Sequence, residues 1–463
     1  MNTVKTTAPA AFDTHGYAEP RQRDPYVYQV GFGNLFASQA LPGVLPEGQN
    51  TPQKSKYDLF PEAINGTPFT VPRANNQRTW FYRILPSVAH SGMVPAKQNP
   101  FLISDFSPSL PNVHVNANQV KWKSFEIPTS QKVDFIQGIR TMGGNGTAAS
   151  RDGMAFHMYL ANQSMEKTAF VNNDGDLLIV PEVGRLDIQT ELGRLMVAPG
   201  EIAVVQAGMK FKVTLPDALY EVYGAHYSLP ELGPLGANGM ANLRDFEYPV
   251  ASFEVDQTAW KLIYKIGGQL FECNQNHTPF DVVAWHGNYV PFKYDISKFI
   301  ITQNVNKDHA DPSLYCILRV PSKFPGISLL EFCAISGPFY ITATNTFRPP
   351  FFHRNSAAEY VHFIKGGPGG VFGYNGFTPH GPTLDTWEQG TTEEQVPKLT
   401  YDGVTLTLIE PFQNLLLTDF AVKCNEFENS SVDDWAHTPG FLKHVKSINA
   451  ELKAEGRPEI KVA

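Results

Sequence analysis

Two histidines and one glutamate, His353, Glu359 and His380, form the part of the sequence best suited to chemistry. On an extended strand alternate side chains share a face, so His353 and Asn355 should point to the same side. After one bend Glu359 can face the same interior, and a hairpin partner that ends in His380 can complete the set. We therefore expect two imidazoles and one carboxylate, here called the ligand set, to converge on one metal ion in a jelly roll.

The donor types of the ligand set favour ferrous iron. Two imidazoles and one carboxylate leave coordination positions open for a substrate and dioxygen together. A structural zinc site would instead use four protein ligands, usually including thiolates, and no such cluster lies here. The nearest rival ligand is His362, three residues after Glu359, which faces away from the set if that strand is regular.

Three other residues are candidates for the site, each with a second interpretation. His286 stands between an apolar run and a Gly-Asn turn, and it is either an acid or base or a hydrogen-bonded histidine of the core. Arg348 and Arg354 flank the first ligand. They either attract an anionic substrate or pair with carboxylates at a sheet edge.

Composition indicates a folded, soluble chain. Of 463 residues, 42% are hydrophobic and 18% charged, a balance typical of globular proteins rather than disordered ones. The net charge is −8 and no Lys/Arg run is present, which argues against nucleic acid as a partner. Four scattered cysteines without a CxxC pair indicate a reducing compartment. No secretory signal or membrane-length apolar run is evident, so we expect a cytoplasmic protein with no membrane contact.

The 36 prolines and 37 glycines punctuate short apolar runs, as in a β-sandwich or barrel. Residues 175–214 show this rhythm without any ligand set, and residues 328–420 repeat it with the set. We predict a mainly β, cupin-like jelly roll with a larger metal-free domain at 1–280 and a smaller metal-bearing domain at 281–463. Leu442, Val445, Ile448 and Leu452 recur at helical spacing and predict a terminal helix.

Several longer segments resemble those of the homogentisate 1,2-dioxygenase family, in the order in which they occur there. The resemblance extends from about Gly31 to the C-terminal region. Its segments are Gly31–Ser38, Leu45–Asn50, Trp80–Ser87, Glu221–Gly224, Gly233–Gly239, Trp285–Tyr289 and Phe347–Asn355.

The resemblance implies a role for each matching residue. The family's iron ligands match His353, Glu359 and His380, and its catalytic histidine matches His286. It further implies an Fe(II) cofactor, a small aromatic substrate with O2, and a homo-oligomer, either a trimer or a hexamer built from trimers.

One region departs from the family pattern. Between Glu359 and His380 the family usually carries a longer loop whose tyrosine and additional histidine line the substrate pocket. Here the link is short and glycine-rich, from Gly366 to Gly376, and Tyr374 is the tyrosine that can substitute. The resemblance therefore implies the type of reaction more directly than it implies the substrate.

We predict an Fe(II)-dependent ring-cleaving dioxygenase that opens a 2,5-dihydroxyphenyl substrate. The favoured reaction is that of homogentisate to maleylacetoacetate in tyrosine and phenylalanine breakdown. One alternative is the same chemistry on another hydroquinone or on a catechol, because the pocket wall differs. A second is a non-catalytic metal-binding jelly roll. A zinc hydrolase or isomerase is a third, although the site has no second carboxylate nearby to serve as its base.

Overall fold

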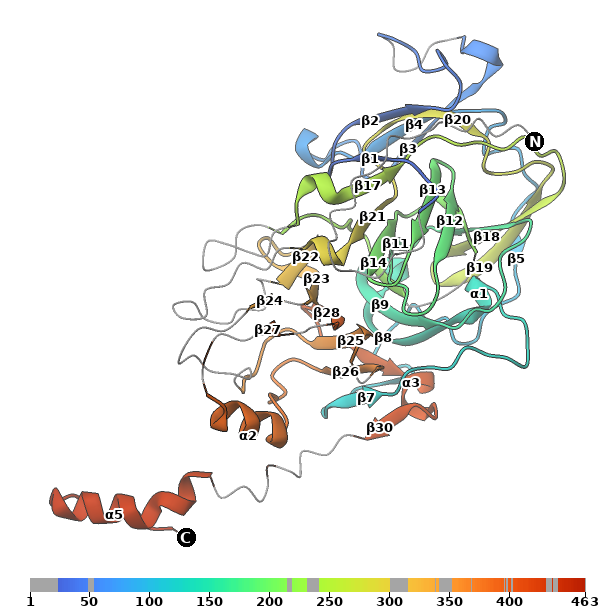
Figure 1. The fold of residues 1–463 in the computed structure, drawn as a ribbon. Helices are drawn as coiled ribbons and strands as arrows, with labels where there is room; N and C mark the ends of the chain where they lie inside the picture. The colour runs from blue at the N-terminus through green and yellow to red at the C-terminus, as the bar shows by residue number, and fades with distance from the viewer. Residues whose placement is uncertain are drawn as a thin grey trace.

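A computed structural model describes residues 24–48, 54–214, 219–230, 241–299, 315–337, 339–340, 352–367, 369–394, 396, 399–400, 403–429, 435 and 440–462. Strands dominate these residues and helices are short, so the predicted mainly β architecture is confirmed. Figure 1 shows the sheets stacked in one body, with the C-terminal helix standing away from it.

The largest sheet has ten strands in the described part of the chain, and most of its residues come from the N-terminal half. Its apolar strands alternate with Pro and Gly turns, as residues 175–214 predict. In spatial order the strands are β1 (Tyr28–Val30), β17 (Phe246–Pro249), β21 (Phe292–Asp295), β14 (Glu201–Val205), β11 (Gly175–Ile179), β16 (Leu219–Tyr223), β9 (Asp152–Tyr159), β8 (Ile139–Thr147), β29 (Leu416–Thr418) and β6 (Val113–His114).

A seven-stranded sheet packs beside it to form the sandwich in Figure 1. All of its pairings are antiparallel except that of the fourth and fifth strands in the order below, which run parallel. The strands are β13 (Gly193–Val197), β12 (Leu186–Thr190), β15 (Lys210–Thr214), β10 (Thr168–Asn172), β18 (Trp260–Ile266), β19 (Gln269–Gln275) and β5 (Val94–Pro95).

A four-stranded sheet at the top of Figure 1 carries His286. Its strands are β2 (Phe36–Gln39), β20 (Val282–Gly287), β4 (Arg78–Arg83) and β3 (Phe60–Asn65). Arg83 on β4 is buried and forms ion pairs with Glu62, Glu191 and Asp281 at 2.7–3.0 Å. Because Glu191 follows β12, this charge cluster ties the four-stranded sheet to the sandwich.

A second seven-stranded sheet positions the ligand set. Its strands are β22 (Cys316–Pro321), β23 (Ser328–Ser336), β28 (Thr405–Pro411), β25 (Glu359–Lys365), β26 (Val371–Tyr374), β7 (Val120–Trp122) and β30 (Phe427–Asn429). Strand β7, from the N-terminal part of the chain, pairs with β26 in this sheet. Conversely, β29, from the C-terminal part, pairs with β8 in the ten-stranded sheet. The two halves of the chain therefore contribute strands to each other's sheets.

The remaining described elements are small. Strands β24 (Phe339–Tyr340) and β27 (Leu399–Thr400) form a two-stranded sheet. The α-helices are α1 (Phe135–Gly138), α2 (Leu384–Thr392), α3 (Asp419–Lys423) and α5 (Val445–Ala454). The predicted terminal helix is confirmed as α5, and Gly456 follows it with a φ of +69°, as at many helix ends. Short 3₁₀ turns are η1 (Lys56–Asp58), η2 (Arg73–Asn75), η3 (Ala148–Ser150), η4 (Leu243–Asp245), η5 (Ile296–Lys298) and η7 (Gly440–His444).

One apolar cluster runs through both halves of the chain. It contains Trp122, Phe156, Trp285, Phe332 and Tyr360, all with little or no exposure to solvent. The ring centroids of Phe156 on β9 and Tyr360 on β25 lie 6.4 Å apart. The sheet that carries the ligand set is thus packed directly on the N-terminal sandwich, which gives the site a rigid support.

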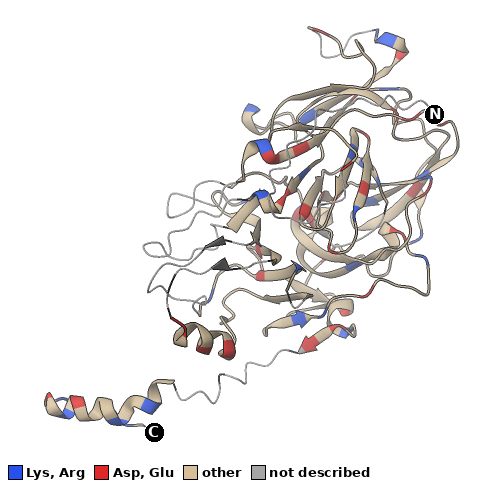
Figure 2. Ribbon diagram, in the orientation of Figure 1, with Lys and Arg blue, Asp and Glu red and all other residues tan. Residues whose placement is uncertain are grey.

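Charged residues of both signs are mixed over the fold (Figure 2), and the cysteines are present as thiols. Figure 2 shows Lys and Arg interspersed with Asp and Glu over the drawn ribbon. All four cysteines are free. Among the helices in the described parts of the chain, none has the length and apolar character needed to cross a lipid bilayer.

Candidate metal centre

The hairpin of β25 and β26 places Glu359 directly opposite Tyr374 in an antiparallel pair. Residues paired in this way project to the same face of a sheet. Next to them, Gly373 lies opposite Tyr360, and a Cβ on Gly373 would come 2.3 Å from Cδ1 of the Tyr360 ring. Only glycine lets the ring lie flat against β26, so this residue sets how closely the hairpin closes.

The two histidines lie on chain segments that flank this hairpin and pair with each other. The backbone N–H of His353 donates to the carbonyl of His380 at 2.9 Å, and the N–H of His380 donates to the carbonyl of His353 at 3.1 Å. Because directly opposed residues share a face, both imidazoles turn to the same side, where the Glu359 carboxylate lies within 3.4 Å of each. The structure thereby brings together the three residues that the spacing selects.

The donor atoms of the ligand set are close enough to share one ion. Nε2 of His353 is 3.4 Å from Oε1 of Glu359, and Nε2 of His380 is 3.3 Å from the same oxygen. All three donors lie within 4.8 Å of one another. Nε2 of His380 is also buried and makes no hydrogen bond. Its contact with the Glu359 carboxylate is thus an ion pair without hydrogen-bond geometry, and a metal ion between these atoms would satisfy the nitrogen and the carboxylate together, so the residues fit a metal.

Electrostatics prepare the set for a cation. Burial raises the pKa of Glu359, but the neighbouring His380 and His353 outweigh that effect and hold its pKa below the usual value. Burial lowers the pKa of His380, whereas its contact with Glu359 and the Thr378 carbonyl raise it more. Glu359 is therefore ionised at neutral pH, as a ligand must be. Burial, followed by the charge of Glu359, raises the pKa of Tyr374 to about 12, which keeps its hydroxyl neutral.

Neighbouring groups hold two of the ligands in position. Nδ2 of Asn355 donates to Oε1 of Glu359. The carbonyl of Thr378 lies 2.9 Å from Nδ1 of His380, which fixes the tautomer that leaves Nε2 without a proton. Strand alternation puts Asn355 on the ligand face without assigning it to the site, and Thr378 is not among the predicted site residues. The i, i+2 spacing of Thr378 and His380 was the available signal.

The other candidate residues lie in different places. Arg354 is exposed, next to the first ligand, and Arg348 lies outside the described residues. Tyr374 is buried against His380, with ring centroids 4.0 Å apart. His362 is fully buried with Nε2 3.2 Å from Glu182, so it turns away from the ligand set as predicted.

His286 lies in another sheet. It is on β20, between Ala37 of β2 and Trp80 of β4, and its ring stacks on Tyr82 with centroids 6.1 Å apart. Figure 1 shows β20 at the top of the molecule and β25 and β26 well below it. Within one chain, therefore, His286 is not beside the ligand set.

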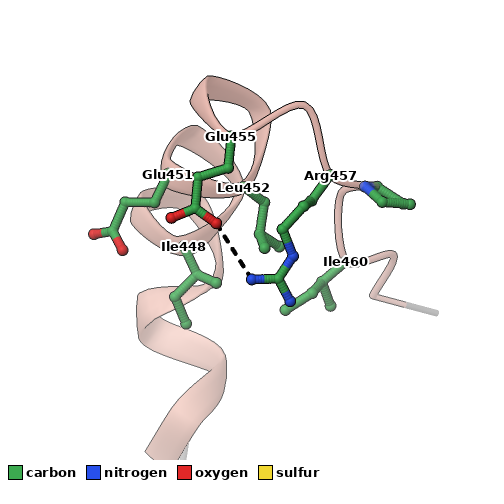
Figure 3. Close-up of a pocket in the computed structure, with 7 residues that line it drawn as sticks. Ile448, Glu451, Leu452, Glu455, Arg457 and Ile460 are labelled. Atoms are coloured by element: carbon green, nitrogen blue, oxygen red, sulfur yellow. Dashed lines mark hydrogen bonds and ion pairs between the residues drawn. The ribbon is translucent and has the colours of Figure 1, made fainter.

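A separate hollow lies at the terminal helix, shown in Figure 3. Ile448 and Leu452 of α5 and Ile460 of the following tail give it an apolar wall, and Arg457 pairs with Glu455 at 3.3 Å across its rim. Its lining includes no histidine or cysteine and brings no three donor groups together, so it is not a metal site.

The fold and donors define a mainly β protein in which two histidines and one carboxylate could hold a metal ion. The chain belongs to the homogentisate 1,2-dioxygenase family: the family's N-terminal model matches residues 27–296 and its C-terminal model matches residues 297–441. The predicted resemblance is confirmed.

Relatives named homogentisate 1,2-dioxygenase match along most of the chain. The Caenorhabditis elegans protein is 42% identical over 89% of this chain and 97% of its own length. The Arabidopsis thaliana protein is 45% identical over 90% of each. Among solved structures, a cupin 2 conserved barrel domain protein from Leptotrichia buccalis covers 61% of this chain and 92% of its own, with 8% identity and a TM-score of 0.26, too low to add to these assignments.

Proposed function

We propose that this protein is an Fe(II)-dependent dioxygenase that opens the ring of homogentisate with O2 to give maleylacetoacetate. The observation that carries the proposal is the convergence of His353, Glu359 and His380. Membership of the family supports the reaction type, and the names of the relatives support the substrate.

The ligand set would hold iron and leave part of its coordination sphere to the reactants. When bound, Fe(II) on such a set supplies open positions for a ring hydroxyl and for O2, which brings both reactants together. Asn355 keeps the carboxylate of Glu359 turned toward the imidazoles. The Thr378 carbonyl holds the Nδ1 proton of His380, so the opposite nitrogen is the donor.

Acid–base work is assigned to His286 on the strength of the family resemblance. A ring hydroxyl must lose its proton before the ring is attacked, and a neutral imidazole nitrogen is a suitable acceptor near neutral pH. Because β20 is remote from β25 within one chain, His286 would have to serve the ligand set of another copy. The proposed trimer or hexamer would provide that copy.

Substrate contacts are proposed for Tyr374, Arg348 and Arg354. Exposed Arg354 adjoins the first ligand and carries the fixed positive charge that a substrate carboxylate would need. The other arginine lies beyond the described residues. Tyr374 borders the ligand set directly.

Oxygen uptake by reduced, iron-loaded protein tests the proposal against homogentisate, gentisate, hydroquinone and homoprotocatechuate. We expect stoichiometric iron, uptake of one O2 per homogentisate, and homogentisate clearly preferred. Preference for another ring would keep the chemistry and overturn the substrate. Iron without oxygen uptake on any of them would indicate a binding protein, and zinc in place of iron would overturn the dioxygenase proposal.

A further inference from the structure

The ring of His380 contacts two other rings. Tyr374 stacks on it almost in parallel, with centroids 4.0 Å apart and an angle of 13° between planes. His353 meets it at 60°, with centroids 4.2 Å apart. A metal-ligating imidazole must keep its nitrogen aimed at the ion. The hydrogen bond at Nδ1 fixes the tautomer, and a flat ring stacked on the imidazole restricts its rotation as well.

Tyr374 is itself fixed by the residues around it. It is the last residue of β26 and is 8% exposed. The next residue, Asn375, receives the backbone N–H of Leu415 at 3.0 Å and donates from Nδ2 to the Leu415 carbonyl at 3.1 Å. The same amide donates to the carbonyl of Asn116 at 3.0 Å. The residue that follows the stacking ring is therefore tied to two other segments of the chain.

The position of Tyr374 also links two ligands. It lies opposite Glu359 in the β25–β26 pair and stacks on His380, which follows six residues later. In this short hairpin Tyr374 thus pairs through its backbone with the strand that carries the carboxylate, and its ring packs on the segment that carries the imidazole. A side chain with one face occupied by a ligand ring is suited to holding that ligand.

We infer that Tyr374 is a positioning residue for His380, whose stacked ring presets the imidazole for metal binding. The inference rests on the proposed metal centre and concerns the ring rather than the hydroxyl. It predicts that Tyr374→Phe keeps the affinity of the ligand set for a metal ion, whereas Tyr374→Leu and Tyr374→Met, which fill similar space without a flat ring, weaken it.

Anaerobic titration of metal-free protein with Co(II) tests the inference without any measurement of turnover. Co(II) absorption bands report the geometry of its ligands. We expect Tyr374→Phe to bind within about twofold of wild type and to retain its spectrum. Tyr374→Leu and Tyr374→Met should bind about 10–100-fold more weakly with altered bands, the range for lost supporting contacts to a ligand.

Phe363→Leu is the matched control. Phe363 is an aromatic residue of the same hairpin that packs on Phe372, with centroids 6.0 Å apart. The Phe363→Leu variant should lose some thermal stability and keep the Co(II) affinity and spectrum of wild type. Folded Tyr374→Leu or Tyr374→Met protein with wild-type affinity and bands would overturn the inference alone. Failure of wild-type protein to bind metal would overturn the proposed function and this inference with it.

Discussion

Glu359 is the residue on which the ligand set depends most. Its Oε1 lies 3.4 Å from Nε2 of His353 and 3.3 Å from Nε2 of His380, and it is the only carboxylate of the group. Glu359→Gln preserves shape but removes the charge that offsets a cation. We expect loss of stoichiometric iron, measured by metal analysis, together with at least a 100-fold loss of oxygen uptake. His362→Gln is the control, since His362 faces Glu182 and should keep its iron.

His226 gives a prediction for pH. Burial lowers its pKa, but the contact with Asp176 at 2.9 Å outweighs this and raises the pKa from 6.5 to about 9. Its ring also meets Tyr289 edge-on, and Nε2 lies 2.9 Å from the Gly66 carbonyl. Because the folded pKa exceeds the unfolded one, the stabilisation is present below pH 6.5 and is lost as pH rises through 9.

The measurement is the difference in melting temperature between wild type and His226→Gln from pH 6 to pH 10. The difference in melting temperature should be largest near pH 6 and shrink toward pH 10. The corresponding difference in the free energy of unfolding has an upper limit of about 3 kcal/mol. A difference that stays constant, or grows with pH, would mean that His226 is not held in its charged form.

At the scale of elements, the turn after β25 depends on two glycines that face each other. Gly366 has a φ of +69°, and a Cβ there would lie 2.1 Å from the carbonyl oxygen of Gly403. Gly403 has a φ of +70° but would meet nothing within 4 Å. Gly403→Ala should therefore cost only the backbone strain, about 1 kcal/mol. Gly366→Ala adds a backbone clash and should cost about 3 kcal/mol or more.

Calorimetry at one scan rate compares the two alanine variants directly. Both positions have a left-handed backbone, so the strain of an alanine there is the same in the two variants. A larger fall in melting temperature for Gly366→Ala therefore measures the clash with the Gly403 carbonyl. Equal shifts for both would show that the turn relaxes and that the hairpin is not tightly constrained there.

Local patterns in the sequence predict the elements that depend on near neighbours along the chain and do not predict those that depend on distant residues. The spacing of His353, Glu359 and His380 could be interpreted because strand alternation and one hairpin are short-range geometry. The pairing of β7 with β26 joins residues about 250 positions apart, and no local pattern encodes it. The same holds for Arg83, whose partner Glu191 is 108 residues away. The stack of Tyr374 depends on side-chain packing, which residue types alone do not specify.

At the scale of the whole molecule, the separation of β20 from β25 makes the proposed role of His286 depend on assembly. His286→Ala and Glu359→Ala should each be inactive alone, while His286→Ala keeps its iron. If one copy lends His286 to the ligand set of another, a mixed oligomer contains some sites with both parts intact. Random mixing in equal amounts should restore about one quarter of the sites of a cyclic oligomer.

Co-expression of the two variants with different affinity tags, followed by purification through both tags, yields oligomers that contain both. Oxygen uptake per iron is then compared with each variant alone. Because neither variant chain carries both an intact His286 and an intact ligand set, activity in the mixture can arise only from a site built by two copies. An inactive mixture would assign the acid–base step to a residue of the same chain, and full activity of His286→Ala alone would remove His286 from the mechanism.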